Sequence, residues 1–173
     1  AGTYTSALQV TGNDAGNYIV TVTNADLNIA KAALTLTGNS LATTYNGQTQ
    51  SVAGYTASGL QGSDTVADLT NVSASGASGR NAGSYTNAVT AGTQTNYDVT
   101  VQNGTLAIAK ANATVTGTAT SVTYNGSTQN QSAATTSGFI AGDAITISGQ
   151  ASGKNAGTYT SALQVTGNDA GNY

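Results

Sequence analysis

The stretch NYDVTVQNGTLAIAKA, residues 96–111, decides the fold class, and a close variant, NYIVTVTNADLNIAKA, occupies residues 17–32. Both stretches alternate apolar or β-branched residues with polar ones, which is the period of a half-buried strand. Each is interrupted by a turn signal, and Asn103-Gly104 suits a type I′ turn. We therefore predict two β-hairpins, Tyr18–Ala30 and Tyr97–Ala109.

The rest of the chain reads as further short strands separated by turns. Tyr45-Asn46-Gly47 and Tyr124-Asn125-Gly126 have the composition of strand-ending turns. No window of ten residues shows helical periodicity with caps, and a single helical turn at 58–62 is the one helical alternative we retain. The expected fold class is all-β or β-rich. The further strands predicted are Ala33–Thr37, Thr65–Leu69, Ser84–Val89, Ala113–Thr116, Ala144–Ser148 and Thr158–Val165.

The chain repeats itself on two scales. Residues 1–18 recur unchanged as residues 156–173. A weaker repeat has an offset of 79 residues up to the matched segments 58–64 and 137–143, and an offset of 74 residues after them. A repeat of about this length predicts tandem small modules in a linear array. A parallel β-solenoid would need a period of about 20–30 residues. The frame predicts the tail of one module (1–30), a complete module (31–110) and the head of a third (111–173).

Composition excludes most chemistry. The chain has 173 residues, 6% of them charged; all seven acids are Asp, and His, Cys and Glu are absent. These absences remove the usual zinc sites, Ser-His-Asp machinery and disulfides. Four Lys and Arg residues are too few for a surface that follows nucleic-acid phosphates. No apolar run approaches the length of a membrane helix. We expect no enzyme, no catalytic, metal or cofactor-binding residues and no cofactor.

Several motifs nevertheless invite a functional interpretation. Asp64 and Asp68 form a pair that the second module does not repeat, so a solvated turn is the better interpretation. The loop GNDAGN, at 12–17 and 167–172, has one carboxylate and lacks the calcium-loop pattern, which favours an Asx-type turn. The Thr-rich strands favour a wet strand face over an ice- or glycan-binding ladder.

Four basic residues repeat with the modules. Lys31 and Lys110 occupy the same place in IAKA, where an edge-guarding charge is the simpler interpretation and an isopeptide cross-link is the alternative. Arg80 and Lys154, in G[RK]NAG, are predicted to be surface charges at a turn.

Taken together, the motifs resemble the MBG and YDG repeat domains of bacterial filamentous-haemagglutinin-like and biofilm-matrix adhesins. The resemblance rests on [TV]TYNG-x-TQ, SG-[LF], G-[RK]-NAG-[ST]-YT and NY-x-VTV-x-N followed by IAKA, and it covers nearly the whole chain. Asn46, in place of the Asp of a strict YDG motif, favours the MBG type. The resemblance implies a secreted or cell-surface spacer built from β-rich modules, β-grasp-like or β-sandwich-like, without catalytic residues.

Two functions remain open at this point. The first is a structural segment of an extracellular adhesin fibre, whose partners are identical neighbouring repeats packed end to end. Such repeats could complete one another by strand addition, because a bare hairpin is marginal in water and an unfilled sheet edge binds strands. The second is a module that binds glycans or another cell surface. Neither function involves nucleic acid or membrane insertion.

Overall fold

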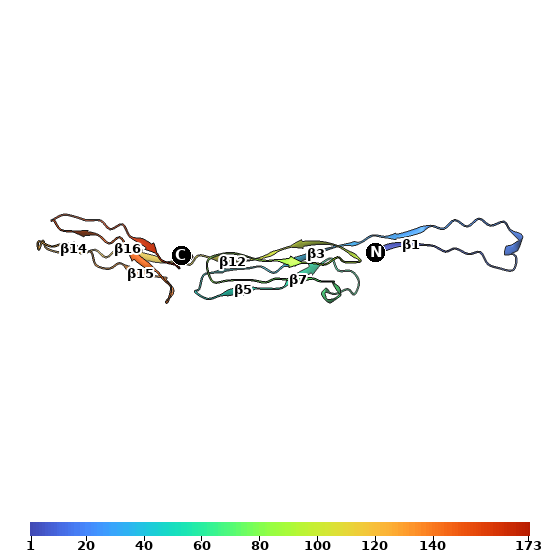
Figure 1. The fold of residues 1–173 in the computed structure, drawn as a ribbon, viewed down its shortest axis with the longest axis horizontal. Coiled ribbons are helices and arrows are strands. Elements are labelled where there is room, and N and C mark those ends of the chain that lie inside the picture. The colour runs from blue at the N-terminus through green and yellow to red at the C-terminus, as the bar shows by residue number, and fades with distance from the viewer.

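The computed structural model describes residues 1–173 as an elongated all-β chain (Figure 1). We call residues 1–30 the N-terminal arm, 31–110 the central module and 111–173 the C-terminal segment. The arm extends from one end of the central module and the C-terminal segment from the other. Eighteen strands and three short 3-10 helices are present, without an α-helix, which confirms the all-β prediction. None of the helices has the length and apolarity needed to cross a membrane.

The central module consists of five long strands, each built from two consecutive β-strands. Each long strand starts in one half of the module and ends in the other. In chain order they are β3 (Ala32–Gly38) with β4 (Leu41–Thr44), β5 (Gln50–Val52) with β6 (Tyr55–Ser58), β7 (Ser73–Ala74) with β8 (Ala77–Gly79), β9 (Gly83–Asn87) with β10 (Val89–Thr90), and β11 (Tyr97–Gln102) with β12 (Gly104–Ala109).

Each half of the module contains one three-stranded sheet and one two-stranded sheet. The first half holds sheets β11-β3-β6 and β10-β7, and the second holds β4-β12-β9 and β5-β8. The pairs β11–β3 and β12–β4 are parallel, and all other pairs are antiparallel. The cores of the two halves are Leu34, Leu36, Val89 and Tyr97, and Tyr45, Ala77, Leu106 and Ile108. Between the predicted alternatives, this helix-free arrangement is the sandwich-like one.

Asn87 ties the long strands together where they switch sheets. Its fully buried side chain accepts a hydrogen bond from the Gly76 amide at 2.9 Å. It donates to the carbonyls of Asn39 at 3.1 Å and Gly54 at 2.9 Å. The breaks in four long strands thus meet at one side-chain amide, and the Gly54 carbonyl also accepts a hydrogen bond from the Asn39 amide at 3.0 Å.

The predicted Tyr97–Ala109 hairpin is wrong, because β11 and β12 are two parts of one long strand. Asn103 and Gly104 lack the positive φ angles of a type I′ turn. Asn103 instead accepts a hydrogen bond from the Val89 amide through its side chain, at 3.0 Å. A Cβ on Gly104 would lie 2.1 Å from the Asn39 carbonyl oxygen, so the glycine permits the close approach of the first and fifth long strands.

The C-terminal segment repeats the first four long strands and has no counterpart of the fifth. Its pairs β13–β15, β14–β17 and β16–β18 reproduce β3–β6, β5–β8 and β7–β10 of the central module. The strands are β13 (Thr114–Thr116), β14 (Gln129–Asn130), β15 (Thr135–Ser137), β16 (Thr146–Ser148), β17 (Ser152–Gly153) and β18 (Gln164–Thr166).

The N-terminal arm is a long antiparallel hairpin of β1 (Gly2–Thr5) and β2 (Asp26–Ile29). The predicted hairpin Tyr18–Ala30 is therefore wrong, since β2 pairs with β1 and no strand forms at 18–25. The register matches that of β9 and β12, with Leu27 opposite Tyr4 as Leu106 is opposite Tyr85. The arm therefore corresponds to the fourth and fifth long strands without the other three.

Four local predictions have mixed outcomes. The predicted strand Thr65–Leu69 is wrong: this segment forms η2 (Val66–Asp68), whose first turn is closed by reciprocal bonds between Thr65 and Asp68. No helical turn forms at 58–62. The Tyr-Asn-Gly turns are confirmed, with positive φ at Gly47 and Gly126. The GNDAGN loops contain η1 (Ala15–Asn17) and η3 (Ala170–Asn172).

Candidate functional site

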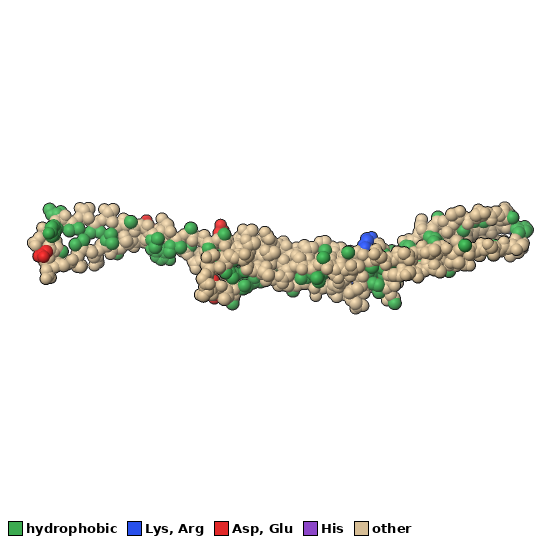
Figure 2. Space-filling model, turned by 180° about the vertical axis from the view of Figure 1, so that it is seen from behind, with side chains coloured by type: hydrophobic (Ala, Val, Ile, Leu, Met, Phe, Trp, Pro, Cys, Tyr) green, Lys and Arg blue, Asp and Glu red, His purple; other side chains and the backbone are tan.

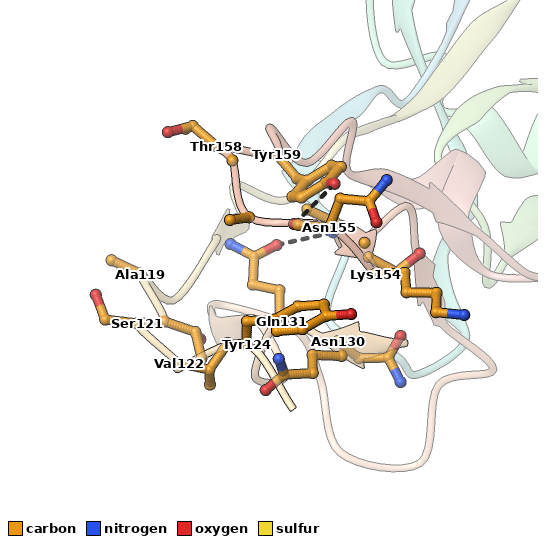
Figure 3. Close-up of a pocket in the computed structure, with 17 residues that line it drawn as sticks. Ala119, Ser121, Val122, Tyr124, Asn130, Gln131, Lys154, Asn155, Thr158 and Tyr159 are labelled. Atoms are coloured by element: carbon orange, nitrogen blue, oxygen red, sulfur yellow. Dashed lines mark hydrogen bonds between the residues drawn. The ribbon is translucent and has the colours of Figure 1, made fainter. Parts of the chain in front are cut away.

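The C-terminal segment contains an open groove with a volume of about 530 Å³ (Figure 3). Residues 119–124 line one side and 155–159 the other, and residues of β14 and β17 line the space between them. Tyr124, Val122 and Tyr159 are 61%, 62% and 47% exposed. The groove therefore presents apolar side chains that no other part of the chain covers.

In the central module, β12 occupies the corresponding space. Strand β12 lies between β4 and β9, pairing in parallel with one and antiparallel with the other. Its Leu106 and Ile108 are 0% and 3% exposed and pack with Tyr45, the counterpart of Tyr124. The groove thus corresponds in position to the fifth long strand of the central module.

The N-terminal arm carries the opposite deficiency, an apolar strand without a core. Leu27 and Ile29, the counterparts of Leu106 and Ile108, are 61% and 49% exposed. The arm also keeps the side-chain contact at the sheet switch, because Asn24 accepts a hydrogen bond from the Leu8 amide at 3.2 Å, as Asn103 does from Val89. Along β1 and β2, its backbone is therefore arranged as in a complete module.

A second candidate site joins the central module to the C-terminal segment. We call Tyr45, Arg80, Asp143, Asp169 and Tyr173 the junction cluster. The Asp143 carboxylate, whose side chain is 2% exposed, accepts hydrogen bonds from the hydroxyls of Tyr45 (2.8 Å) and Tyr173 (2.6 Å) and pairs with Arg80 at 2.7 Å. Arg80 also pairs with Asp169 at 2.7 Å. The Arg80 guanidinium lies 5.7 Å from the centre of the Tyr45 ring, within cation–π range.

The charges of the junction cluster shift its acid–base equilibria. Hydrogen bonds from the Ala144 amide and then from Arg80 lower the pKa of Asp169. Burial and the hydrogen bond to Asp143 raise the pKa of both Tyr45 and Tyr173. The contact with Asp169 raises the pKa of Arg80. The cluster therefore favours charged Asp169 and Arg80 together with neutral tyrosines.

The opposite end of the central module repeats one side of this junction. Tyr97 donates to Asp64 at 2.6 Å and accepts from the Gln61 amide at 2.9 Å, just as Tyr173 donates to Asp143 and accepts from the Ile140 amide at 2.8 Å. No residue takes the place of Tyr45 or Arg80 there. The Asp64 end is therefore half of a junction.

The charged residues singled out in the sequence have different roles in the structure. Asp64 and Asp68 do not act as a pair, since Asp64 binds Tyr97 and Asp68 caps η2, where the Thr65 amide lowers the pKa of Asp68. The ammonium groups of Lys31 and Lys110 each donate to a backbone carbonyl, at 2.6 and 3.0 Å. Lys154 lies at the mouth of the groove, whereas Arg80, predicted to be a simple surface charge, belongs to the junction cluster.

Sequence reasoning missed the roles of Tyr45, Asp143 and Tyr173. The signal was available in the repeat, because Tyr45 and Tyr124, Asp64 and Asp143, and Tyr97 and Tyr173 recur as matched pairs. Residues 167–172 were assigned only a turn, whereas Asp169 and Asn172 bind Arg80 and the Ala82 amide across the junction. The same sequence at 12–17 lies exposed at the tip of the arm.

Comparison with known proteins finds a family model that matches most of the central module. Residues 34–107 match the model of the MBG domain (YGX type), a repeat domain of surface proteins, which confirms the resemblance found in the sequence. No curated protein and no solved structure shows significant similarity to the chain.

Proposed function

We propose that this chain is a structural segment of an extracellular adhesin fibre, in which MBG-type modules act as spacers packed end to end. The match to a surface-protein repeat domain and the elongated shape support this function (Figure 1). The groove and the arm further suggest that neighbouring repeats complete one another's sheets. The fibre's work is mechanical: it holds a distal region at a distance under tension.

One observation carries the proposal: the first and fifth long strands of the central module are parallel neighbours. The chain enters the module through β3, beside the arm, and leaves it through β12, beside the C-terminal segment, at the other end of the long axis (Figure 1). Tension between these points pulls the first long strand toward one end of the module and the fifth long strand toward the other. The two parallel pairs, β3–β11 and β4–β12, are therefore loaded in shear. All hydrogen bonds of the two parallel ladders then bear load together, because shear cannot open them one at a time.

The surface is compatible with a long exposed fibre. Figure 2 shows few charged side chains scattered over a surface that is mostly uncharged and polar, with apolar side chains along the arm. Low charge gives neighbouring modules little mutual repulsion. Absence of Cys and Met removes the side chains most readily oxidised outside a cell.

Force spectroscopy on the full chain tests the spacer function. Since the chain has no cysteine, Lys31→Cys with Lys110→Cys gives handles that shear the parallel ladders. The matched control, Gln48→Cys with Lys110→Cys, places both handles at the same end and opens β4 from β12 bond by bond. We expect the shear pair to unfold at several-fold higher force. Equal forces in the two geometries would contradict a load-bearing role.

A second candidate function is glycan binding in the groove. Tyr124 and Tyr159 are exposed there beside the polar side chains of Gln131 and Lys154 (Figure 3). Exposed aromatic rings next to hydrogen-bonding groups suit sugar recognition. NMR titration of the chain with a panel of oligosaccharides tests this function, with Tyr124→Ala as the variant expected to lose binding. Unchanged Tyr124 and Tyr159 signals across the panel would rule it out.

A further inference from the structure

We propose that Arg80 fixes the orientation of the C-terminal segment relative to the central module, because its guanidinium group joins two loops of each region. The junction connects two successive repeats that are both present in the chain. The orientation is a property of this chain, and its consequence for a fibre rests on the proposed spacer function.

Each region contributes two loops to the junction. In the central module they are loop 45–49, between β4 and β5, and loop 80–82, between β8 and β9. In the C-terminal segment they are loop 138–145, between β15 and β16, and loop 167–172, which follows β18. Each loop is held by the strands beside it. A single side chain that contacts all four loops therefore couples the strands of both regions.

The Arg80 side chain makes these contacts with three different nitrogen atoms. Its Nη2 pairs with Asp143 and its Nη1 pairs with Asp169, both at 2.7 Å. Its Nε donates a hydrogen bond to the Gly47 carbonyl at 3.0 Å. The three acceptors lie on three loops, and Arg80 itself lies on the fourth. Because the donors of a guanidinium form a planar, rigid fork, the directions of the three contacts are fixed relative to one another.

The two carboxylates that bind Arg80 are themselves held in place. Asp143, whose side chain is 2% exposed, also accepts hydrogen bonds from the hydroxyls of Tyr45 at 2.8 Å and Tyr173 at 2.6 Å. Asp169 accepts a hydrogen bond from the Ala144 amide at 2.8 Å. Neither carboxylate is free to follow the guanidinium if one region turns. A change of orientation therefore breaks contacts of the guanidinium instead of carrying its partners along.

The remaining contacts hold the two regions together without this geometry. The Asn172 side chain accepts a hydrogen bond from the Ala82 amide at 2.8 Å. The rings of Tyr45 and Tyr173 meet edge to face, with their centres 5.6 Å apart. Each of these contacts joins one place in the central module to one in the C-terminal segment. Loss of the Arg80 contacts should therefore loosen the orientation while the regions stay docked.

The sequence offers the substitution that separates geometry from charge. At the turn equivalent to that of Arg80 the residue is Lys154, and loop 90–97, equivalent to 166–173, has no acidic residue. Arg80 thus meets the version of the loop that carries an acid, Asp169. A Lys keeps the positive charge on one compact ammonium group, which lacks the planar fork of Arg. Arg80→Lys therefore keeps the charge and removes the geometry.

Distances between spin labels in the full chain test the proposal. Because the chain has no cysteine, Ser51→Cys in β5 and Thr135→Cys in β15 place one label on each side of the junction, at exposed positions. We expect Arg80→Lys to broaden the distance distribution of this pair about twofold, because one ammonium group cannot hold all three acceptors. An unchanged width would overturn the proposal.

Two matched controls make the measurement specific to the junction. Lys154→Arg, at the equivalent turn, lies outside the junction and should leave the distribution unchanged. A label pair within the C-terminal segment, Thr135→Cys with Ser152→Cys, should be unaffected by Arg80→Lys. Broadening of that inner pair would place the motion inside the segment and would overturn its assignment to the junction.

Asp169→Asn tests whether Arg80 acts by joining two loops of the C-terminal segment. The Asn keeps an acceptor for the Ala144 amide but has no negative charge for Arg80. We expect it to broaden the distribution as Arg80→Lys does, and the double variant to add little, because both changes break the same bridge. An unchanged width in Asp169→Asn would show that Arg80 acts through Asp143 alone, which would overturn the bridge between loops.

The same variant separates this inference from the spacer function. Arg80 lies outside the parallel pairs β3–β11 and β4–β12, so Arg80→Lys should leave the unfolding force between positions 31 and 110 unchanged. A broadened label distribution together with equal forces in the two pulling geometries would uphold the role of Arg80 and contradict the spacer. An unchanged distribution together with a high shear force would overturn the role of Arg80 and leave the spacer supported.

Discussion

The central module and the C-terminal segment share a sequence pattern, yet only one of them has a core. Tyr45 is 3% exposed and its counterpart Tyr124 is 61% exposed. The two regions form the same pairs among their first four long strands, so the difference comes from the fifth. Four strands establish the outline, and the fifth strand closes the core over them.

The largest effect should come from truncating the fifth strand where it is buried. Leu106→Ala removes a side chain with no exposure from the second core cluster, and we expect it to lower the free energy of unfolding of the central module by about 2–5 kcal/mol. Leu27→Ala, at the equivalent exposed position, should cost less than about 0.5 kcal/mol. Hydrogen exchange of central-module amides measures the first cost, and exchange of the amides of β1 and β2 measures the second. Similar costs would show that the arm is already packed.

Asn87→Ala should have the next largest effect. The substitution leaves the Gly76 amide and the Asn39 carbonyl without the Asn87 partner, at a cost of about 1–3 kcal/mol, while the Gly54 carbonyl keeps its hydrogen bond from the Asn39 amide. Ser161 holds the equivalent place in the C-terminal segment, and Ser161→Ala should change stability little. Urea unfolding of the two variants makes the comparison. An equal loss in both would mean that Asn87 does not hold the sheet switch.

A smaller effect is expected at the start of η2. Thr65→Ala removes the hydroxyl that binds Asp68, which should cost about 0.5–1 kcal/mol. The equivalent residue in the C-terminal segment is already Ala144, so this variant makes the central module resemble the other region. Hydrogen exchange of the Asp68 and Leu69 amides reports the change. Faster exchange throughout the module would point to a wider role for this turn.

The smallest effects should be those of pH on the junction cluster. The pKa of Asp169 is lowered in the folded chain. Its contribution to the stability of the folded state is therefore complete above the usual Asp pKa of about 4, and it is lost as the pH falls through the lowered pKa. Because the pKa values of Tyr45 and Tyr173 are raised, their contribution is complete below about 10 and is lost at higher pH. The protection factors of the Ala82 and Ala144 amides, which are corrected for the intrinsic pH dependence of exchange, should therefore fall at both extremes. A flat profile would place the junction's stability elsewhere.

The sequence predicted the strand class, the repeat and the turns at Tyr-Asn-Gly, because alternation and turn residues act locally. It misassigned the connection at Asn103-Gly104, where the same residues suit a hairpin turn and a close crossing of distant strands. Only the partner across the crossing, Asn39, distinguishes the two. The junction cluster escaped for the same reason, since Arg80 and Asp143 meet only after two modules have folded.

The parallel pairing of the first and fifth long strands also governs how the module folds. Ala32 pairs with Tyr97, 65 residues further along the chain. The entropy of closing so large a loop must be spent before those hydrogen bonds form, which makes folding slow for a domain of this size. During synthesis the N-terminal end of a module is made first. The edge of its first long strand then stays unpaired until the fifth long strand, about the last dozen residues, has been made. Each module is thus completed in a single late step, and the order of synthesis sets the order in which modules close.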